Sequence, residues 1–189
     1  MKIITAKSAG FCFGVRRAVD LTFEKREQFD ELSTYGELVH NPIVVEQLLQ
    51  KNIQNVENID EIPNGSKIII RAHGVPKYIY EKLDTLGIEY FDSTCVFVKK
   101  VHDIVSCVSE DAIVLLAGDK NHPEVIGILG YCPVPVTCFK TAKELEEVLL
   151  NNANFINKQV VLVAQTTFNV EEWKKCQEIL KKVCTNRCV

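Results

Sequence analysis

The 189-residue sequence lacks several features that define whole classes of proteins. No apolar run approaches the roughly 20 residues that cross a bilayer, which argues against a membrane-spanning helix. There is no basic run, and the net charge is -3, so nothing favours a nucleic-acid partner. The first candidate strand begins at Lys2, which leaves no space for a signal peptide. We therefore expect a cytoplasmic protein with neither a membrane nor a nucleic-acid partner.

Two common cofactor motifs are also absent. The sequence has no Gly-x-x-x-x-Gly-Lys-Ser/Thr loop, so a P-loop is not its phosphate binder. Cys12 and Cys95 have no closely paired ligand of the C-x2-C kind, and Cys184 and Cys188 have no second pair nearby, which argues against a zinc finger. In a cytoplasmic protein thiols stay reduced, so eight cysteines favour metal or redox chemistry over disulfides.

Strand and helix patterns alternate along almost the whole chain. Strands are expected at 3–6, 33–37, 67–71, 88–91, 112–117, 134–139 and 159–164. Helices are expected to begin near residues 15, 42, 76, 96 and 121, and after the capping residues Thr141 and Asn169. This alternation predicts an α/β fold of two tandem, pseudo-repeated small units with mainly parallel sheets, residues 1–93 and 94–189.

Apolar stripes predict which helical residues face the core. We expect one stripe in the helix from Val96 and another in the last helix. Their members are Val101, Ile104, Val105 and Val108 in the first, and Cys176, Ile179, Leu180 and Val183 in the second.

Two cysteines share one local context. Cys12 and Cys95 each follow a candidate strand and open a helix, and each is followed three residues later by Val and then by two basic residues. A helix N-terminus offers unpaired N–H groups and a dipole that lowers a thiol's pKa. A single cysteine is usually a small buried hydrophobe, but the repetition favours a nucleophile or a metal ligand.

Three of the four histidines, His40, His73 and His122, lie at strand-to-helix turns with a proline one to three residues later. Sites in parallel sheets lie at the carboxyl ends of strands. Histidines and helix N-termini both donate N–H groups, so these turns could cradle an anion. His102 lies inside a helix pattern, and we interpret it as structural.

A carboxyl group and a hydroxyl group lie in the same kind of turn. Glu124 follows His122 by two residues, and Thr166 ends the last expected strand. Beside an anion site, this pair could relay protons. Glu124 equally suits compensation of the helix dipole in a first turn, and local sequence leaves both interpretations open.

Six different short motifs occur along the chain. They are Gly10-Phe11-Cys12-Phe13-Gly14-Val15, Val39-His40-Asn41-Pro42, Ala72-His73-Gly74-Val75, Asp92-Ser93-Thr94-Cys95, His122-Pro123-Glu124-Val125 and Gln165-Thr166-Thr167. In this order and at this spacing they resemble the 4-hydroxy-3-methylbut-2-enyl diphosphate reductase family over the whole chain.

The resemblance implies a three-unit α/β trefoil around a [4Fe-4S] cluster. The implied cluster ligands are Cys12 and Cys95, the implied diphosphate ligands are His40, His73 and His122, and the implied proton donor is Glu124, positioned by Thr166 with support from Thr167. The implied reaction removes the hydroxyl of a small allylic diphosphate as water, with a ferredoxin or flavodoxin as electron donor. Its products are isopentenyl and dimethylallyl diphosphate.

The sequence departs from the family pattern at several positions. Val96 replaces a proline, and Asp119-Lys120-Asn121 replaces the usual small and His residues. The third ligand motif, Ile-Cys-x-Ala-Thr, is absent, since Cys184 and Cys188 do not fit it, and we expect that ligand beyond Val189. We therefore expect a truncated, poorly active or inactive reductase. The alternatives are a non-catalytic anion-binding module without the cluster, and a structural fragment whose cysteines merely pack.

Overall fold

The computed structural model describes residues 3, 4, 6, 9–151 and 158–183. Contacts divide the chain into two compact units: unit 1 comprises residues 1–72 and 82–95, and unit 2 comprises residues 73–81 and 96–189. The sequence-based boundaries, residues 1–93 and 94–189, stay a prediction. Cys184 and Cys188 lie outside the described residues.

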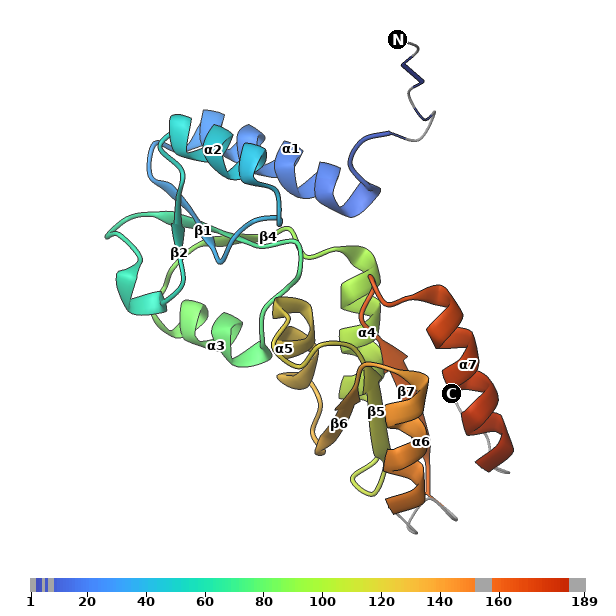
Figure 1. Cartoon of the computed structure of the whole chain (residues 1–189). Coiled ribbons are helices and arrows are strands. Elements are labelled where there is room, and N and C mark those ends of the chain that lie inside the picture. The colour runs from blue at the N-terminus through green and yellow to red at the C-terminus, as the bar shows by residue number, and fades with distance from the viewer. Residues whose placement is uncertain (1–2, 5, 7–8, 152–157, 184–189) are drawn as a thin grey trace. The chain divides into compact units, whose positions relative to one another are not determined.

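Unit 1 is built on a parallel sheet with the strand order β2-β1-β3-β4. Its strands are β1 (Leu32–Tyr35), β2 (Gln54–Val56), β3 (Lys67–Ile70) and β4 (Tyr90–Asp92). Its helices are α1 (Phe13–Gln28), α2 (Pro42–Gln50) and a 3-10 turn at Ile59–Glu61, while α3 (Lys77–Thr85) is shared between the units. Figure 1 shows α1 and α2 side by side over the sheet, and the core confirms that they cover one face, because Ala18 and Leu48 pack there with Ile69 of β3.

Local sequence explains why these elements begin and end where they do. The Asn41 side chain accepts hydrogen bonds from the N–H groups of Ile43 and Val44, and Pro42 occupies the first helical position of α2, as predicted. Gly87 has φ +65° just after α3, a left-handed conformation that glycine adopts without strain.

Unit 2 is a doubly covered parallel sheet with the strand order β6-β5-β7. Its elements are β5 (Ile113–Ala117), β6 (Val136–Phe139), β7 (Val160–Ala164), α4 (Val96–Ser106), α5 (Pro123–Leu129), α6 (Ala142–Asn151) and α7 (Val170–Val183). Successive β5 residues point to opposite faces, so Leu115 packs with α6 and α7, whereas Leu116 packs with α4 and α5. The predicted α/β class with parallel sheets is therefore confirmed.

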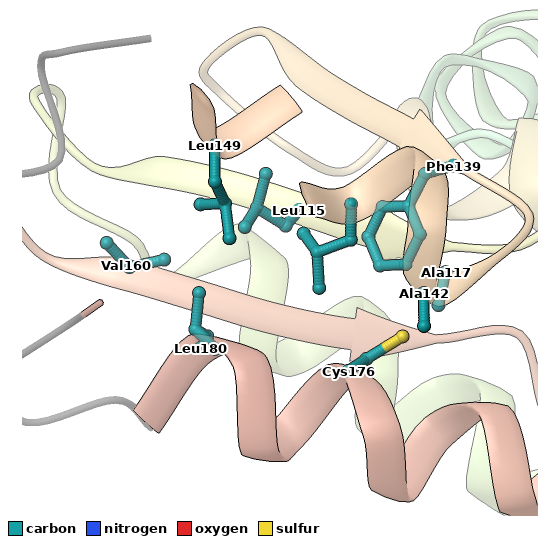
Figure 2. Close-up of a cluster of buried hydrophobic side chains, with 9 residues drawn as sticks. Leu115, Ala117, Phe139, Ala142, Leu149, Val160, Cys176 and Leu180 are labelled. Carbon is teal, nitrogen blue, oxygen red and sulfur yellow. The ribbon is translucent and has the colours of Figure 1, made fainter. Parts of the chain in front are cut away.

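Figure 2 shows the core beneath α6 and α7. Leu115 and Phe139 of the sheet meet Leu149 of α6 and Leu180 of α7, and the Cys176 thiol lies among them. Cys176 has no exposed surface, and burial raises the pKa of its thiol. The expectation that Cys176 is a core residue is confirmed.

Three expectations about secondary structure and burial are wrong. Ile3 and Ile4 are outside any strand and 78% and 79% exposed, so no strand formed by the described residues precedes Cys12. Val183 is 48% exposed because α7 continues past its last core residue, Leu180. Ile104 is 38% exposed, because the buried side of α4 is centred on Val98, His102 and Val105 instead.

His102 has the structural role that its helical position predicts. It is 3% exposed, and its ring stacks on Tyr131 with centroids 4.1 Å apart.

Among the described residues, no helix is long and apolar enough to cross a membrane.

Candidate functional site

Both predicted cysteine ligands lie in unit 1 beside the first turn of α1. Cys12 is the exposed N-cap of α1, and its side chain makes no capping hydrogen bond. Cys95 follows β4, and its backbone N–H donates to the carbonyl oxygen of Ala72 at 2.9 Å. A Cβ added to Gly14 would lie 2.7 Å from the Cys95 Sγ. The same helical turn therefore carries one cysteine and faces the other.

His40 lies after β1 in unit 1. Its Nδ1 lies 2.7 Å from the Glu37 carboxylate, and its side chain is 48% exposed. A carboxylate at Nδ1 orients the imidazole and leaves Nε2 on the opposite side of the ring. The carboxylate accepts a hydrogen bond, so Nδ1 carries the proton, and Nε2 donates only when the ring is protonated on both nitrogens. His40 is therefore an accessible and oriented imidazole at the carboxyl end of its strand.

His73 and His122 meet in unit 2. Their rings lie edge to face, with centroids 5.5 Å apart and planes at 82°. His122 is the N-cap of α5, and its Nδ1 accepts the backbone N–H of Glu124 at 3.1 Å. A nitrogen that accepts a hydrogen bond carries no proton, so the proton of neutral His122 lies on Nε2. His122 can thus donate one hydrogen bond to a ligand while it caps its helix.

Glu124, in the first turn of α5, and Thr166, in the β7–α7 loop, form a two-point contact in unit 2. Glu124 is 1% exposed, Oε1 accepts the Thr166 backbone N–H at 2.6 Å, and Oε2 accepts the Thr166 hydroxyl at 2.8 Å. Thr166 itself is exposed. A buried carboxyl group is thereby connected to the surface through one hydroxyl, an arrangement suited to proton transfer. Dipole compensation alone does not require these bonds.

Gln165 joins the β7–α7 loop to the β5–α5 loop, a role that the sequence did not reveal. Its Oε1 accepts the Asp119 backbone N–H at 3.3 Å, and its Nε2 donates to the Thr167 hydroxyl oxygen at 2.8 Å. Since the Thr167 oxygen accepts this bond, its own O–H remains able to donate elsewhere. The contact spans 46 residues, so no local pattern signals it.

Asp119 adds a fixed negative charge near His122. Its carboxylate accepts the Asn121 backbone N–H at 3.0 Å and pairs with the Lys140 ammonium at 3.0 Å. The Asn121 N–H, followed by Lys140, holds the pKa of Asp119 below its ordinary value. The sequence showed Asp119 only as a departure from the family pattern, and Lys140 had no predicted role.

The fold and these residues define a parallel α/β protein with polar groups at the carboxyl ends of its strands, a cysteine pair in one unit and an acid–hydroxyl pair in the other. The chain belongs to the LytB protein family, whose model matches residues 3–188. This membership confirms the resemblance found in the sequence.

Two similar proteins share one name. The chain is 39% identical over 186 residues to the 4-hydroxy-3-methylbut-2-enyl diphosphate reductase of Caldanaerobacter subterraneus subsp. tengcongensis, a match that covers 96% of this chain and 62% of the relative. It is 40% identical over 173 residues to the reductase of Clostridioides difficile, covering 90% of this chain and 61% of that protein. The chain therefore spans less than two thirds of the length of these relatives.

Solved structures of the same enzyme match the fold. The reductase from Plasmodium falciparum gives a TM-score of 0.85 at 28% identity and covers 97% of this chain and 57% of its own. A second structure, described as the terminal enzyme of the non-mevalonate pathway, gives a TM-score of 0.80 at 36% identity and covers 99% of this chain and 66% of its own.

Proposed function

We propose that this chain takes part in the reductive dehydroxylation of 4-hydroxy-3-methylbut-2-enyl diphosphate in cytoplasmic isoprenoid precursor synthesis. The substrate's C–O bond would break with two electrons and two protons, giving isopentenyl and dimethylallyl diphosphate and water. The observation that carries the proposal is the hydrogen-bonded series His122, Glu124 and Thr166, with His73 at its end. The names of the relatives support the choice of substrate.

The histidines would bind the diphosphate. His122 would donate through Nε2–H, because its Nδ1 accepts a hydrogen bond from the Glu124 backbone, and His73 packs against the same ring. His40, oriented by Glu37, would supply a further N–H donor when its ring is protonated on both nitrogens. Thr167 would add a hydroxyl donor, because Gln165 already occupies one lone pair of its oxygen. Binding a group remote from the reacting bond positions that bond.

Glu124 would deliver the proton that converts the leaving hydroxyl to water. Its carboxyl group is buried, and its path to the surface is the Thr166 hydroxyl. Thr166 would also hold the substrate hydroxyl, because an O–H that donates to Glu124 leaves lone pairs that accept a second bond.

Cys12 and Cys95 fit the donor set of an iron–sulfur cluster. The Cys12 side chain makes no capping bond, and the Cys95 sulfur lies beside Gly14 in the first turn of the helix that Cys12 begins, so both thiols could serve one ligand. When bound, a [4Fe-4S] cluster would supply the electrons, received from a ferredoxin or flavodoxin, and a Lewis-acidic iron. The family's trefoil would supply a third cysteine from a third unit.

Anaerobic reconstitution with iron and sulfide tests the cluster assignment. We expect a broad visible absorption that Cys12→Ser and Cys95→Ser each abolish, whereas Cys107→Ser, a change at another exposed cysteine, retains it. Absorption that survives both serine variants would overturn the assignment.

Titration with inorganic pyrophosphate tests the anion site. His122→Asn retains a side-chain cap for α5 but removes the Nε2–H, so we expect binding to weaken about tenfold. Pyrophosphate binding by a colourless protein would support the non-catalytic module instead. Absence of both cluster and binding would leave only a structural fragment.

A further inference from the structure

The guanidinium of Arg17 holds the turn that carries Cys95. Arg17 lies on α1, and its terminal nitrogens donate to three successive carbonyl oxygens, those of Asp92 at 3.3 Å, Ser93 at 3.3 Å and Thr94 at 3.1 Å. These three residues directly precede Cys95, and all belong to unit 1. A planar group with five N–H donors can serve several acceptors at once, which the point charge of lysine cannot do in the same way.

The N–H groups of the same turn are satisfied from the other side. Ser93 donates its N–H to Ile70 at 3.2 Å, and its hydroxyl donates to the same carbonyl oxygen. Thr94 donates its N–H to the Asp92 carboxylate at 2.9 Å, and Cys95 donates to Ala72 at 2.9 Å. Ile70 of β3, Ala72 and the Asp92 carboxylate therefore hold the donors of the turn, and Arg17 holds its acceptors.

Helix α1 thus contacts the surroundings of both cysteines. It begins at Cys12, it has Gly14 where any Cβ would collide with the Cys95 sulfur, and it reaches the Cys95 turn through Arg17. Two ligands of one metal group must be held at a fixed separation, and groups behind the ligands commonly set that geometry.

We propose that Arg17 is a positioning residue that holds Cys95 in the geometry required for cluster binding. The proposal rests on the proposed function, since it takes Cys95 as a ligand. Arg17 also places a fixed positive charge behind that ligand. A nearby cation favours the more negative, reduced form of a cluster, so Arg17 raises its reduction potential.

The test compares Arg17→Met and Arg17→Lys with Arg16→Met, which removes the same charge from the neighbouring exposed position. The first readout needs no metal: the rate of iodoacetamide alkylation at each cysteine of the folded chain, resolved by peptide mass spectrometry. We expect Arg17→Met to accelerate alkylation of Cys95 roughly tenfold, because the turn opens more often, and to leave the rate at Cys107 unchanged. Arg17→Lys should fall between wild type and Arg17→Met.

The second readout is the reconstituted cluster. We expect Arg17→Met to lower both the cluster yield and the reduction potential, Arg17→Lys to restore the potential more than the yield, and Arg16→Met to match wild type. Equal alkylation of Cys95 in Arg17→Met and Arg16→Met would overturn the proposal. A wild-type chain that takes up no cluster would overturn the proposed function alone, because the alkylation rates would still show whether Arg17 holds the turn.

Discussion

Both carboxyl oxygens of Glu124 accept hydrogen bonds from a single residue, Thr166. The N–H and the hydroxyl of Thr166 approach different carboxyl oxygens, at 2.6 and 2.8 Å. Thr166 lies 42 residues from Glu124, so this contact ties the β7–α7 loop to the first turn of α5. Position and chemistry can be separated at this site, because an amide has the same shape as a carboxyl group but cannot deliver its proton.

Substitution of Glu124 is expected to show that separation. Glu124→Gln retains an acceptor for the Thr166 N–H, so it should cost about 1 kcal/mol or less in the free energy of unfolding, whereas Glu124→Ala should cost about 2–4 kcal/mol. Urea unfolding measures both. In a form of the protein that turns over, each variant should lose about 10²- to 10⁴-fold in rate. Full turnover by Glu124→Gln would contradict proton donation.

Gly14 is a second residue whose importance is set by a neighbour. Alanine normally stabilises a helix by about 1 kcal/mol relative to glycine. At Gly14, however, a Cβ would lie 2.7 Å from the Cys95 sulfur, so we expect Gly14→Ala to destabilise the protein by about 1–3 kcal/mol.

Gly127 of α5 is the matched control. The nearest heavy atom to a Cβ there is 3.5 Å away, an ordinary contact, so Gly127→Ala should be neutral or stabilising by up to about 1 kcal/mol. Thermal and urea unfolding measure the change in stability of each variant. Similar effects of both would show that the Cys95 sulfur moves aside freely.

At the scale of elements, side-chain caps decide where several helices begin. Asn41 Oδ1 accepts two N–H groups of α2, from Ile43 at 3.0 Å and from Val44 at 3.3 Å. We expect Asn41→Ala to lower the free energy of unfolding by about 1 kcal/mol, and Asn41→Asp, which retains the acceptor, to cost less than half of that. Urea unfolding measures both, and an equal loss in both would argue against the cap.

Glu172 connects two helices of unit 2. It lies in the first turn of α7, and its carboxylate accepts the N–H of Ala142 at the start of α6 at 3.0 Å and pairs with Lys175 at 2.7 Å. The Ala142 N–H, followed by Lys175, lowers the pKa of Glu172 below its ordinary value of 4.5.

This lowered pKa predicts a direction for acid destabilisation. A carboxyl group with a depressed folded-state pKa stabilises the fold fully above its ordinary pKa, and the contribution is lost as pH falls through the folded value. We expect the melting temperature to fall as the pH drops below 4.5, and the fall to be shallower in Glu172→Gln. Melting curves between neutral pH and pH 3 test this, with the exposed Glu171→Gln as control. Identical pH profiles in the two variants would contradict the role of Glu172.

At the scale of the whole molecule, the main question is how much activity this chain supports. It carries two of the three cysteine ligands that the family resemblance implies, and it spans 62% of the Caldanaerobacter relative. Loss of one supporting group at a metal site commonly lowers metal affinity or activity by about 10- to 100-fold. Because this chain lacks a ligand itself, we expect its turnover to be more than about 100-fold below that of a relative.

The measurement is substrate turnover with a reduced viologen dye after anaerobic reconstitution. The Clostridioides difficile reductase, and the same reductase shortened to the 61% that aligns with this chain, are the matched controls. Turnover by the 189-residue chain comparable to that of the unshortened relative would contradict the expectation.

Local chemistry explains which parts of the fold could be predicted. Alternating strands and helices, the caps at Asn41 and Asn169, and the turn at Gly87 depend on neighbouring residues, and all of them agree with the structure. The strand predicted at residues 3–6 does not, because an apolar pattern forms a strand only where another strand pairs with it, and Ile3 and Ile4 stay exposed.

By itself, the sequence determined the α/β class, most of the strands and helices, and the identity of the cysteine, histidine, glutamate and threonine candidates. These follow from periodicity, turn chemistry and motif order, which act over a few residues. Only the tertiary structure decided that Gly14 faces Cys95, that Arg17 holds the turn before it, and that Gln165 joins two loops. Such contacts join residues 46 to 81 positions apart, and their partners are chosen by packing, which local pattern does not encode.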